Sequence, residues 1–240
     1  MSTARSISAY WWVGRRNWGD LLTALLFKHF CELETVWAPA PEAQIAAVGS
    51  IIEHLPDGFT GKIVGSGKLH SESLLPVGRG RILALRGPLT ARGVRGDFCL
   101  GDLGLLANEL VRIETKTHKL CLVPHWSDQK LATREEFLRF DPVVVDPTGD
   151  PLDAIRMIGE SEKVVTSSLH GMIVADAFHI PRRLEFAPRL AAEGAVFKFK
   201  DHCGTVRPGQ PFELAKTVEA NHRIVENAQS ELYDCLRSLA

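Results

Sequence analysis

The sequence has few of the features that mark specialised protein classes. Its 240 residues carry 28 Lys and Arg against 29 Asp and Glu, so the formal net charge of −1 provides no overall field for nucleic acid or an anionic membrane. Any anion-binding site must therefore be local. No repeat of fixed period, low-complexity tract or block of like charges occurs, which excludes solenoid and disordered architectures.

Cysteine pairs and long apolar runs are also missing. The five cysteines are odd in number and scattered, with no C-x-x-C pair, so we expect a reduced cytoplasmic protein without a metal site. The N-terminal stretch "ISAYWWVG" is too short and too aromatic for a signal peptide or a membrane span. We therefore expect that the chain is not exported by that route.

Familiar catalytic and nucleotide-binding motifs fail on spacing. "GSGKLH" has two glycines of a G-x-G-x-x-G motif and lacks the third, and "GFTGK" does not have the spacing of a P-loop. The chain has no G-x-S-x-G elbow and no H-E-x-x-H helix. A serine esterase and a zinc protease are thereby disfavoured.

What the sequence does contain is an alternation of short strand-like runs and longer amphipathic runs. With 45% hydrophobic residues, it can bury a substantial core. The alternation restarts after the polar stretch at residues 112–119, which predicts an α/β protein of two wound halves, residues 1–115 and 116–240, with the site residues facing the cleft between them. A long amphipathic helix is expected from about Phe212 to Leu239.

Polar and glycine-rich segments follow most of the predicted strands. In chain order they are "GRRNWGD", "GS" at residues 49–50, "GSGKLH", "RGPLTAR", "PHWSD" and "SSLHG". Ligands bind at the carboxyl ends of parallel strands, where free N–H groups and helix N-termini favour anions. These segments are therefore the candidate binding loops.

Several of these segments resemble the polysaccharide pyruvyltransferases, bacterial enzymes that form pyruvyl ketals on exopolysaccharide sugars. The resemblance rests on "NWGDLLTALL", "GS", "GSG", "RGPLTA", "GDLGLL", "PH" and "TSSLHGMIVADAFHIP", and it runs in order from about Asn17 to Pro181. The chain departs from the pattern at Ser168, where many relatives have arginine, and at Leu103, where many have proline.

The resemblance implies two Rossmann-like halves similar to the GT-B glycosyltransferases, the first on the acceptor side and the second on the donor side. It also implies phosphoenolpyruvate as donor substrate, with no further cofactor, and a lipid-linked oligosaccharide as acceptor. Contact with the cytoplasmic face of the inner membrane would then come through that acceptor. Such chemistry needs anion clamps, for which arginine is suited, together with an acid and a base.

His170 is the first candidate catalytic residue, because it is expected in the first turn of a helix that follows a strand. We expect it to anchor or protonate the donor; the alternative is a core histidine bonded to a backbone carbonyl. Ser167 and Ser168 are candidate donor ligands, or plain N-caps of that helix. His125, after the strand "LCLV", is a further donor-binding candidate, or an exposed loop residue.

Arg86 is the candidate clamp for the donor, because it is expected to begin a helix, where the helix dipole disfavours a cation unless an anion is near. The alternative is a salt bridge to Asp97 or Asp102. Lys68 and His70 either line the same cleft or lie in a solvated loop.

The loop after the first strand supplies the acceptor candidates. Asp20 is the candidate base or an acceptor of sugar hydroxyls, and Trp18 a stacking face for a pyranose ring. Asn17 and Arg16 complete the acceptor set. The alternative makes Asp20 a helix N-cap and Trp18 a core residue.

Two other functions stay open from the residues alone. A nucleotide-sugar-dependent GT-B glycosyltransferase would bind a nucleotide diphosphate, although no acidic ribose-binding residue follows a glycine-rich turn. A noncatalytic sugar-binding module would leave the placement of Arg86 and His170 unexplained.

Overall fold

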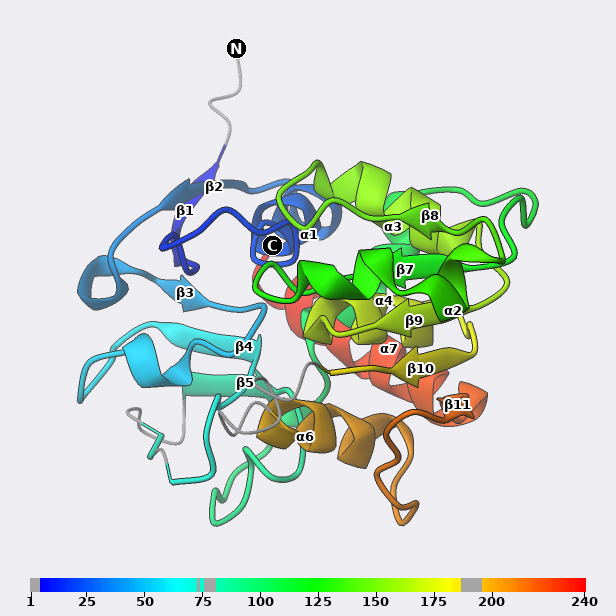
Figure 1. The fold of residues 1–240 in the computed structure, drawn as a ribbon. Helices are drawn as coiled ribbons and strands as arrows, with labels where there is room; N and C mark the ends of the chain where they lie inside the picture. Colours follow the sequence, from blue (N-terminus) through cyan, green and yellow to red (C-terminus); the bar gives the residue numbers. More distant parts are fainter. Residues whose placement is uncertain (1–4, 73, 76–80, 187–195) are drawn as a thin grey trace.

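The computed structural model of the protein describes residues 5–72, 74–75, 81–186 and 196–240. These residues form an α/β fold with two mostly parallel sheets, which lie side by side in Figure 1 with the blue and cyan sheet on the left and the green to orange sheet on the right. The predicted α/β class is confirmed. The closer similarity to GT-B glycosyltransferases and the domain boundary at residue 115 stay predictions.

The first sheet has six parallel strands in the order β2-β1-β3-β4-β5-β6. The strands are short and their inner positions are apolar, as buried parallel strands require. Their bounds are Ser6–Tyr10 for β1, Glu34–Trp37 for β2, Ile45–Ala46 for β3, Lys62–Ser66 for β4, Ile82–Leu85 for β5 and Cys99–Leu100 for β6.

The second sheet has the order β11-β10-β9-β7-β8 and is parallel except for β11, which runs antiparallel to β10. The change from the first sheet to the second falls in the segment after β6, which contains the polar residues 112–119. The bounds are Cys121–Val123 for β7, Val143–Val144 for β8, Val164–Thr166 for β9, Arg182–Leu184 for β10 and Thr217–Val218 for β11.

Helices cover the sheets and connect their strands. The α-helices are α1 at Leu22–Cys31, α2 at Glu135–Leu138, α3 at Pro151–Gly159, α4 at Leu169–Ala177, α6 at Val196–Val206 and α7 at His222–Arg237. The 3₁₀ segments are η1 at Ala40–Glu42, η2 at Ile52–His54, η4 at Leu103–Leu110 and η5 at Gln129–Thr133. None of the helices in the described part of the chain is long and apolar enough to cross a membrane.

The C-terminal helix and the segment after Arg86 differ from the sequence-based expectation. The helix begins at His222 and not near Phe212, because Asn221 caps it by accepting a hydrogen bond from the N–H of Ile224 and β11 occupies the residues before it. Residues 88–93 form successive turns and no helix. The prediction that Arg86 begins a helix was therefore wrong, since Gly87 and Pro88 lead the chain into turns.

One hydrophobic core joins the two sheets. Helix α4, which follows β9 of the second sheet, packs against η4, which follows β6 of the first. A Cβ added to Gly104 of η4 would come within 3.0 Å of Ile173 in α4 and 3.7 Å of Leu22 in α1. This close packing sets the carboxyl ends of strands from both sheets around one space.

Candidate active site

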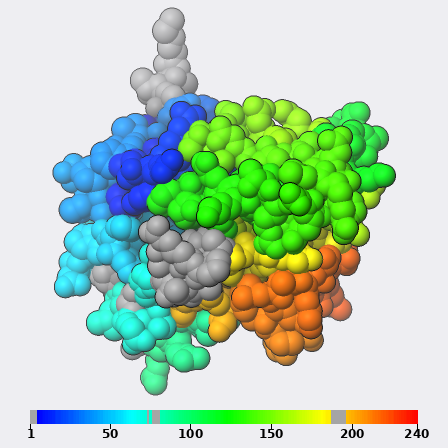
Figure 2. Space-filling model, in the orientation of Figure 1, coloured from blue at the N-terminus to red at the C-terminus, as the bar shows by residue number. Residues whose placement is uncertain are grey.

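A pocket of about 510 Å³ lies where the carboxyl ends of strands from the two sheets face each other. Both sheets contribute loops to it, and in Figure 2 the blue residues near the N-terminus touch green residues of the second sheet along the seam. The first-sheet side supplies Trp12, Asn17, Asp20, Ser50, Ile51, His54, Leu69 and His70, and the second-sheet side supplies His125, Trp126, Ser127, Ser168, Leu169, His170 and Lys198.

His170 lies in the first turn of α4, as predicted, and lines the pocket. Strand β9 ends at Thr166, whose hydroxyl accepts a hydrogen bond from the N–H of Ser168 at 2.9 Å. Ser168 then caps α4 by accepting from the N–H of Gly171. The buried junction of strand and helix therefore fixes the point at which the imidazole enters the pocket.

The His170 imidazole is 6% exposed, and its Nε2 has no hydrogen-bond partner among the described residues. Buried ring nitrogens are normally hydrogen-bonded, so Nε2 is not the atom that a backbone carbonyl would satisfy in the alternative interpretation. Burial, followed by the charge of Lys198, lowers the pKa of His170 to about 3. The ring is therefore neutral at physiological pH, and its buried Nε2 is left without a partner among the described residues.

Backbone glycines bring the first-sheet loops against this imidazole. A Cβ on Gly19 would lie 2.0 Å from His170 Nδ1, so only glycine allows the chain to pass so close. Gly49 has a φ of +97°, and its Cβ position would be 3.3 Å from Asp20 Oδ1 and 3.8 Å from His170 Nε2. Asp20 and His170 thus border the same backbone position, each from a different sheet.

Asp20 is buried at 7% exposure and lines the pocket beside His170. Its carboxylate accepts a hydrogen bond from Asn17 Nδ2 at 2.8 Å, while Asn17 Oδ1 accepts from the N–H of Gly19 at 2.9 Å. Helix α1 has Leu21 at its N-cap position with no side-chain cap, so Asp20 does not have the capping role considered as its alternative. Burial raises the pKa of Asp20 to about 7 against the opposing charge of Lys198.

His125 also lines the pocket and is half-buried. Its backbone N–H donates to Ser167 Oγ at 2.9 Å, and its Nδ1 lies 2.8 Å from Ser127 Oγ. Burial, followed by the charge of Lys198, lowers the pKa of His125 to about 3. The Ser167 hydroxyl is therefore occupied by a hydrogen bond from the backbone of His125, whereas Ser168 both caps α4 and lines the cavity.

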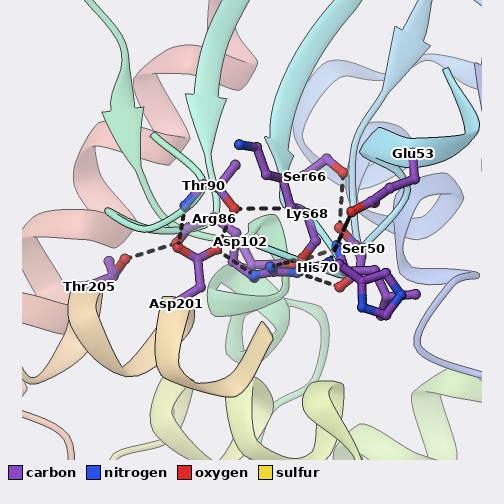
Figure 3. Close-up of polar contacts among 12 residues, drawn as sticks. Ser50, Glu53, Ser66, Lys68, His70, Arg86, Thr90, Asp102, Asp201 and Thr205 are labelled. Carbon is purple, nitrogen blue, oxygen red and sulfur yellow. Dashed lines mark hydrogen bonds and ion pairs between the residues drawn. The ribbon is translucent and has the colours of Figure 1, made fainter. Parts of the chain in front are cut away.

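Arg86 does not line the pocket. Its side chain is fully buried, with Nε 3.0 Å from Asp201 Oδ2 and its terminal nitrogens donating to Ser50 Oγ and the carbonyl of Lys68. Figure 3 shows the guanidinium between Asp201 on α6 and Ser50. The partner is thus neither Asp97 nor Asp102, and the donor-binding role of Arg86 stays a prediction.

The carboxylate of Asp201 also accepts two hydrogen bonds from Thr90, from the N–H at 2.8 Å and from the hydroxyl at 2.6 Å. Thr205 of the same helix donates its hydroxyl to the Arg86 carbonyl at 2.9 Å. These bonds tie the loop after β5 to α6 (Figure 3). The network positions α6 beside the pocket wall.

The structure places the predicted acceptor residues in different environments. Asn17 lines the pocket, Arg16 is exposed outside its lining, and Trp18 is 1% exposed within the hydrophobic core, as its alternative interpretation described. Sequence reasoning missed the pocket tryptophans, Trp12 and Trp126, whose rings stack with centroids 6.0 Å apart.

Lys198 is a further pocket residue that sequence reasoning missed. It lies in the first turn of α6 and is half-buried. Burial lowers the pKa of Lys198 to about 8. No local sequence pattern predicts that Lys198 lines the pocket, because its helix reaches the site only through the tertiary fold.

Within the described residues, no group of three or more His, Cys, Asp or Glu side chains could hold a metal ion. The expectation of a reaction without a metal stays a prediction. What the pocket does provide is a carboxyl group with a raised pKa, two neutral imidazoles and one ammonium group. Such a set suits the binding of an anion and the transfer of protons.

Comparison with known proteins identifies the same family that the motifs resemble. Residues 101–183 match the family described as polysaccharide pyruvyl transferase. Over 183 residues the chain is 31% identical to the succinoglycan biosynthesis protein ExoV of Rhizobium meliloti (strain 1021), covering 72% of this chain and 57% of the relative. The chain thus spans a little over half the length of the curated relative it matches.

The family match contains the second-sheet side of the pocket, including His125, Ser168 and His170, while Asp20 and Lys198 lie outside it. This match, the identity to ExoV and the ordered strand-end motifs together support the polysaccharide pyruvyltransferase family for this chain.

Proposed function

We propose that the protein transfers the pyruvyl group of phosphoenolpyruvate to a sugar of a lipid-linked exopolysaccharide repeat unit. Two hydroxyls of one sugar become bridged as a pyruvyl ketal, and phosphate is released. Phosphoenolpyruvate is the donor substrate, and no further cofactor is required. The reaction takes place in the cytoplasm, and the lipid of the acceptor brings the enzyme to the cytoplasmic face of the inner membrane.

The observation that carries the proposal is that Asp20 and His170 line one pocket and both border the backbone of Gly49. Ketal formation from an enol phosphate needs a proton for the methylene carbon and a base for the sugar hydroxyl. A carboxyl group whose pKa lies near 7 can supply the proton, and a neutral imidazole with a free Nε2 can accept one. This favours Asp20 as acid and His170 as base.

In the proposed reaction, Asp20 gives its proton to the methylene carbon of the donor, which becomes a methyl group. The first sugar hydroxyl adds to the neighbouring carbon, and its proton passes to His170. The bond from that carbon to the phosphate oxygen then breaks, and the second hydroxyl adds to the same carbon. The proton held by His170 leaves with phosphate, and the proton of the second hydroxyl returns to Asp20, so both groups regain their starting states.

Charge and exposure support this order of events. At neutral pH His170 is uncharged, so it cannot be the initial proton donor unless a bound anion first raises its pKa. Asp20 is held against a hydrogen-bond donor, Asn17, which keeps the carboxyl in a fixed position for transfer. On the acceptor side, Asn17 and the edges of Trp12 and Trp126 offer polar and aromatic surface for a sugar.

The test is phosphate release by the purified protein from phosphoenolpyruvate, with and without a repeat-unit oligosaccharide. We expect release only when the acceptor is present, together with a sugar product that carries one pyruvyl group. No release with any pyruvylatable acceptor would contradict the proposal. A raised melting temperature with UDP, GDP or CMP sugars would identify the glycosyltransferase alternative. A sugar-binding module would show no raised melting temperature with either phosphoenolpyruvate or the nucleotide sugars.

A further inference from the structure

The position of Lys198 is unusual for a lysine. It is the third residue of α6, within the first helical turn, where the positive end of the helix dipole disfavours a cation. Its side chain nevertheless turns into the pocket, half-buried. A cation held at such a place is stabilised only when an anion lies near it.

Lys198 has no anionic partner among the described residues. Its Nζ makes no hydrogen bond or ion pair there, and its ring contact is with Phe199, whose centroid is 5.4 Å away. Asp20 is the acidic group of the pocket lining and attracts Lys198 electrostatically, but burial raises the pKa of Asp20 to about 7, so it is only partly ionised at neutral pH. The ammonium group therefore has unused binding capacity.

Arginine does not supply this charge. The described residues that line the pocket include no arginine, and the guanidinium of Arg86 is already bonded to Asp201, Ser50 and Lys68. Four histidines line the cavity, and burial lowers the pKa of two of them, His125 and His170, to about 3. Lys198 is thus the ammonium group of the described pocket lining, and with a pKa of about 8 it is mostly protonated at neutral pH.

The surroundings of Lys198 complete an anion subsite. The hydroxyl of Ser168 lines the pocket at the N-terminus of α4, a nine-residue helix whose dipole favours negative charge there. His170 lines the same cavity, and its buried Nε2 is unpartnered among the described residues. The charge of Lys198 is the largest electrostatic influence on the pKa values of His125, His170 and Asp20, which indicates that it lies close to all three.

We propose that Lys198, facing the N-terminal turn of α4, binds the phosphate group of the donor. Lysine is suited to this role as a compact point charge, whereas a planar carboxylate is better met by the fork of an arginine. The inference rests on the proposed function, because it names the group that holds the donor in that reaction.

The test compares Lys198→Met with Lys200→Met. Lys200 lies in the same helix and also lies over a phenylalanine, Phe212 at 5.8 Å, but it is exposed and outside the pocket lining, which makes it a matched control. We expect Lys198→Met to raise the KM for phosphoenolpyruvate roughly 10- to 100-fold, the range of a lost charged hydrogen bond. Lys198→Arg should recover part of the affinity, and Lys200→Met should behave as the wild type.

A second readout is independent of turnover. Isothermal titration of the wild type with inorganic phosphate should show binding that is lost in Lys198→Met and kept in Lys200→Met, with unchanged melting temperatures. Phosphate binding unaffected by Lys198→Met, or a shifted pH profile with an unchanged KM for the donor, would overturn the inference and assign Lys198 an effect on Asp20 alone. Wild-type protein that binds phosphate through Lys198 yet transfers no pyruvyl group would instead refute the proposed function.

Discussion

The buried ion pair between Arg86 and Asp201 allows a sharp test, because the sequence predicts a donor-binding arginine where the structure places a bonded, fully buried one. Both side chains are 0% exposed, and the pair connects the loop after β5 with α6. Arg86→Met removes the cation and leaves the Asp201 carboxylate in the interior, where Thr90 is its remaining hydrogen-bond donor among the described residues. Asp201→Asn performs the converse experiment and leaves Arg86 without its counter-charge.

The expected loss is large. Removing one partner of a buried ion pair costs about 3–5 kcal/mol, because the other charge stays buried without compensation. For a chain of this size each kcal/mol corresponds to about 2–4 °C, so either variant should lower the melting temperature by about 6–20 °C. The double variant should lose less than the two single losses combined, since the two residues act on one interaction.

An exposed ion pair provides the control. Lys28 and Glu34 contact each other with their side chains 57% and 53% exposed. Lys28→Met should therefore cost less than about 1 kcal/mol. Thermal unfolding followed by circular dichroism, with the KM for phosphoenolpyruvate measured on the same preparations, separates the two roles of Arg86. A melting temperature for Arg86→Met within 2 °C of the wild type, combined with a raised KM, would refute the structural role and favour the donor clamp.

Three further outcomes follow from the pocket. Asp20→Asn should depress turnover and leave donor binding intact. The pKa of Asp20 in the folded protein, about 7, exceeds its ordinary value of 3.8, so the wild type loses stability as pH rises from about 4 to 7. The melting temperature of the variant relative to wild type should therefore be higher at pH 8 than at pH 5, and a pH-independent difference would contradict the burial of this carboxyl. His170→Ala should abolish pyruvyl transfer in a folded protein, because the free Nε2 leaves no orphaned partner, and near-full activity or simple unfolding would return His170 to a packing role. Gly19→Ala removes no functional group but places a methyl 2.0 Å from His170 Nδ1, so kcat should fall, and an unaltered kcat would show that the imidazole position is not critical.

Local sequence patterns were sufficient for the features that short segments determine. The run "KVVTSSLHG" predicts a buried strand, a hydroxyl cap and a histidine in the first helical turn, and the structure has β9, the cap at Ser168 and His170 in α4. Ser167 does not cap the helix, because its hydroxyl accepts from the N–H of His125. The position of Asp20 after the first strand was equally readable. In each case the side chain reaches the pocket because it follows the end of a strand, and a stretch of about ten residues determines where that strand ends.

Features that depend on distant residues could not be predicted in this way. Arg86 finds its partner 115 residues further along the chain, and its own neighbours gave a wrong indication of a helix. Lys198 belongs to a helix that the alternation of apolar residues did not reveal. Trp18 and Trp126 both follow strands, yet only packing determines that the first enters the core and the second the pocket.

The packing of α7 has a consequence for the order in which the chain folds. This helix follows β11 of the second sheet, but it contacts α1, η4, β5 and β6 of the first. The thiol of Cys31 bonds to the carbonyl of Leu236, across 205 residues of sequence. During synthesis the first sheet therefore emerges long before α7, which covers it. We expect its apolar face to stay open until α7 has left the ribosome, with slow, non-local closure of the core and a dependence on chaperones in the interval.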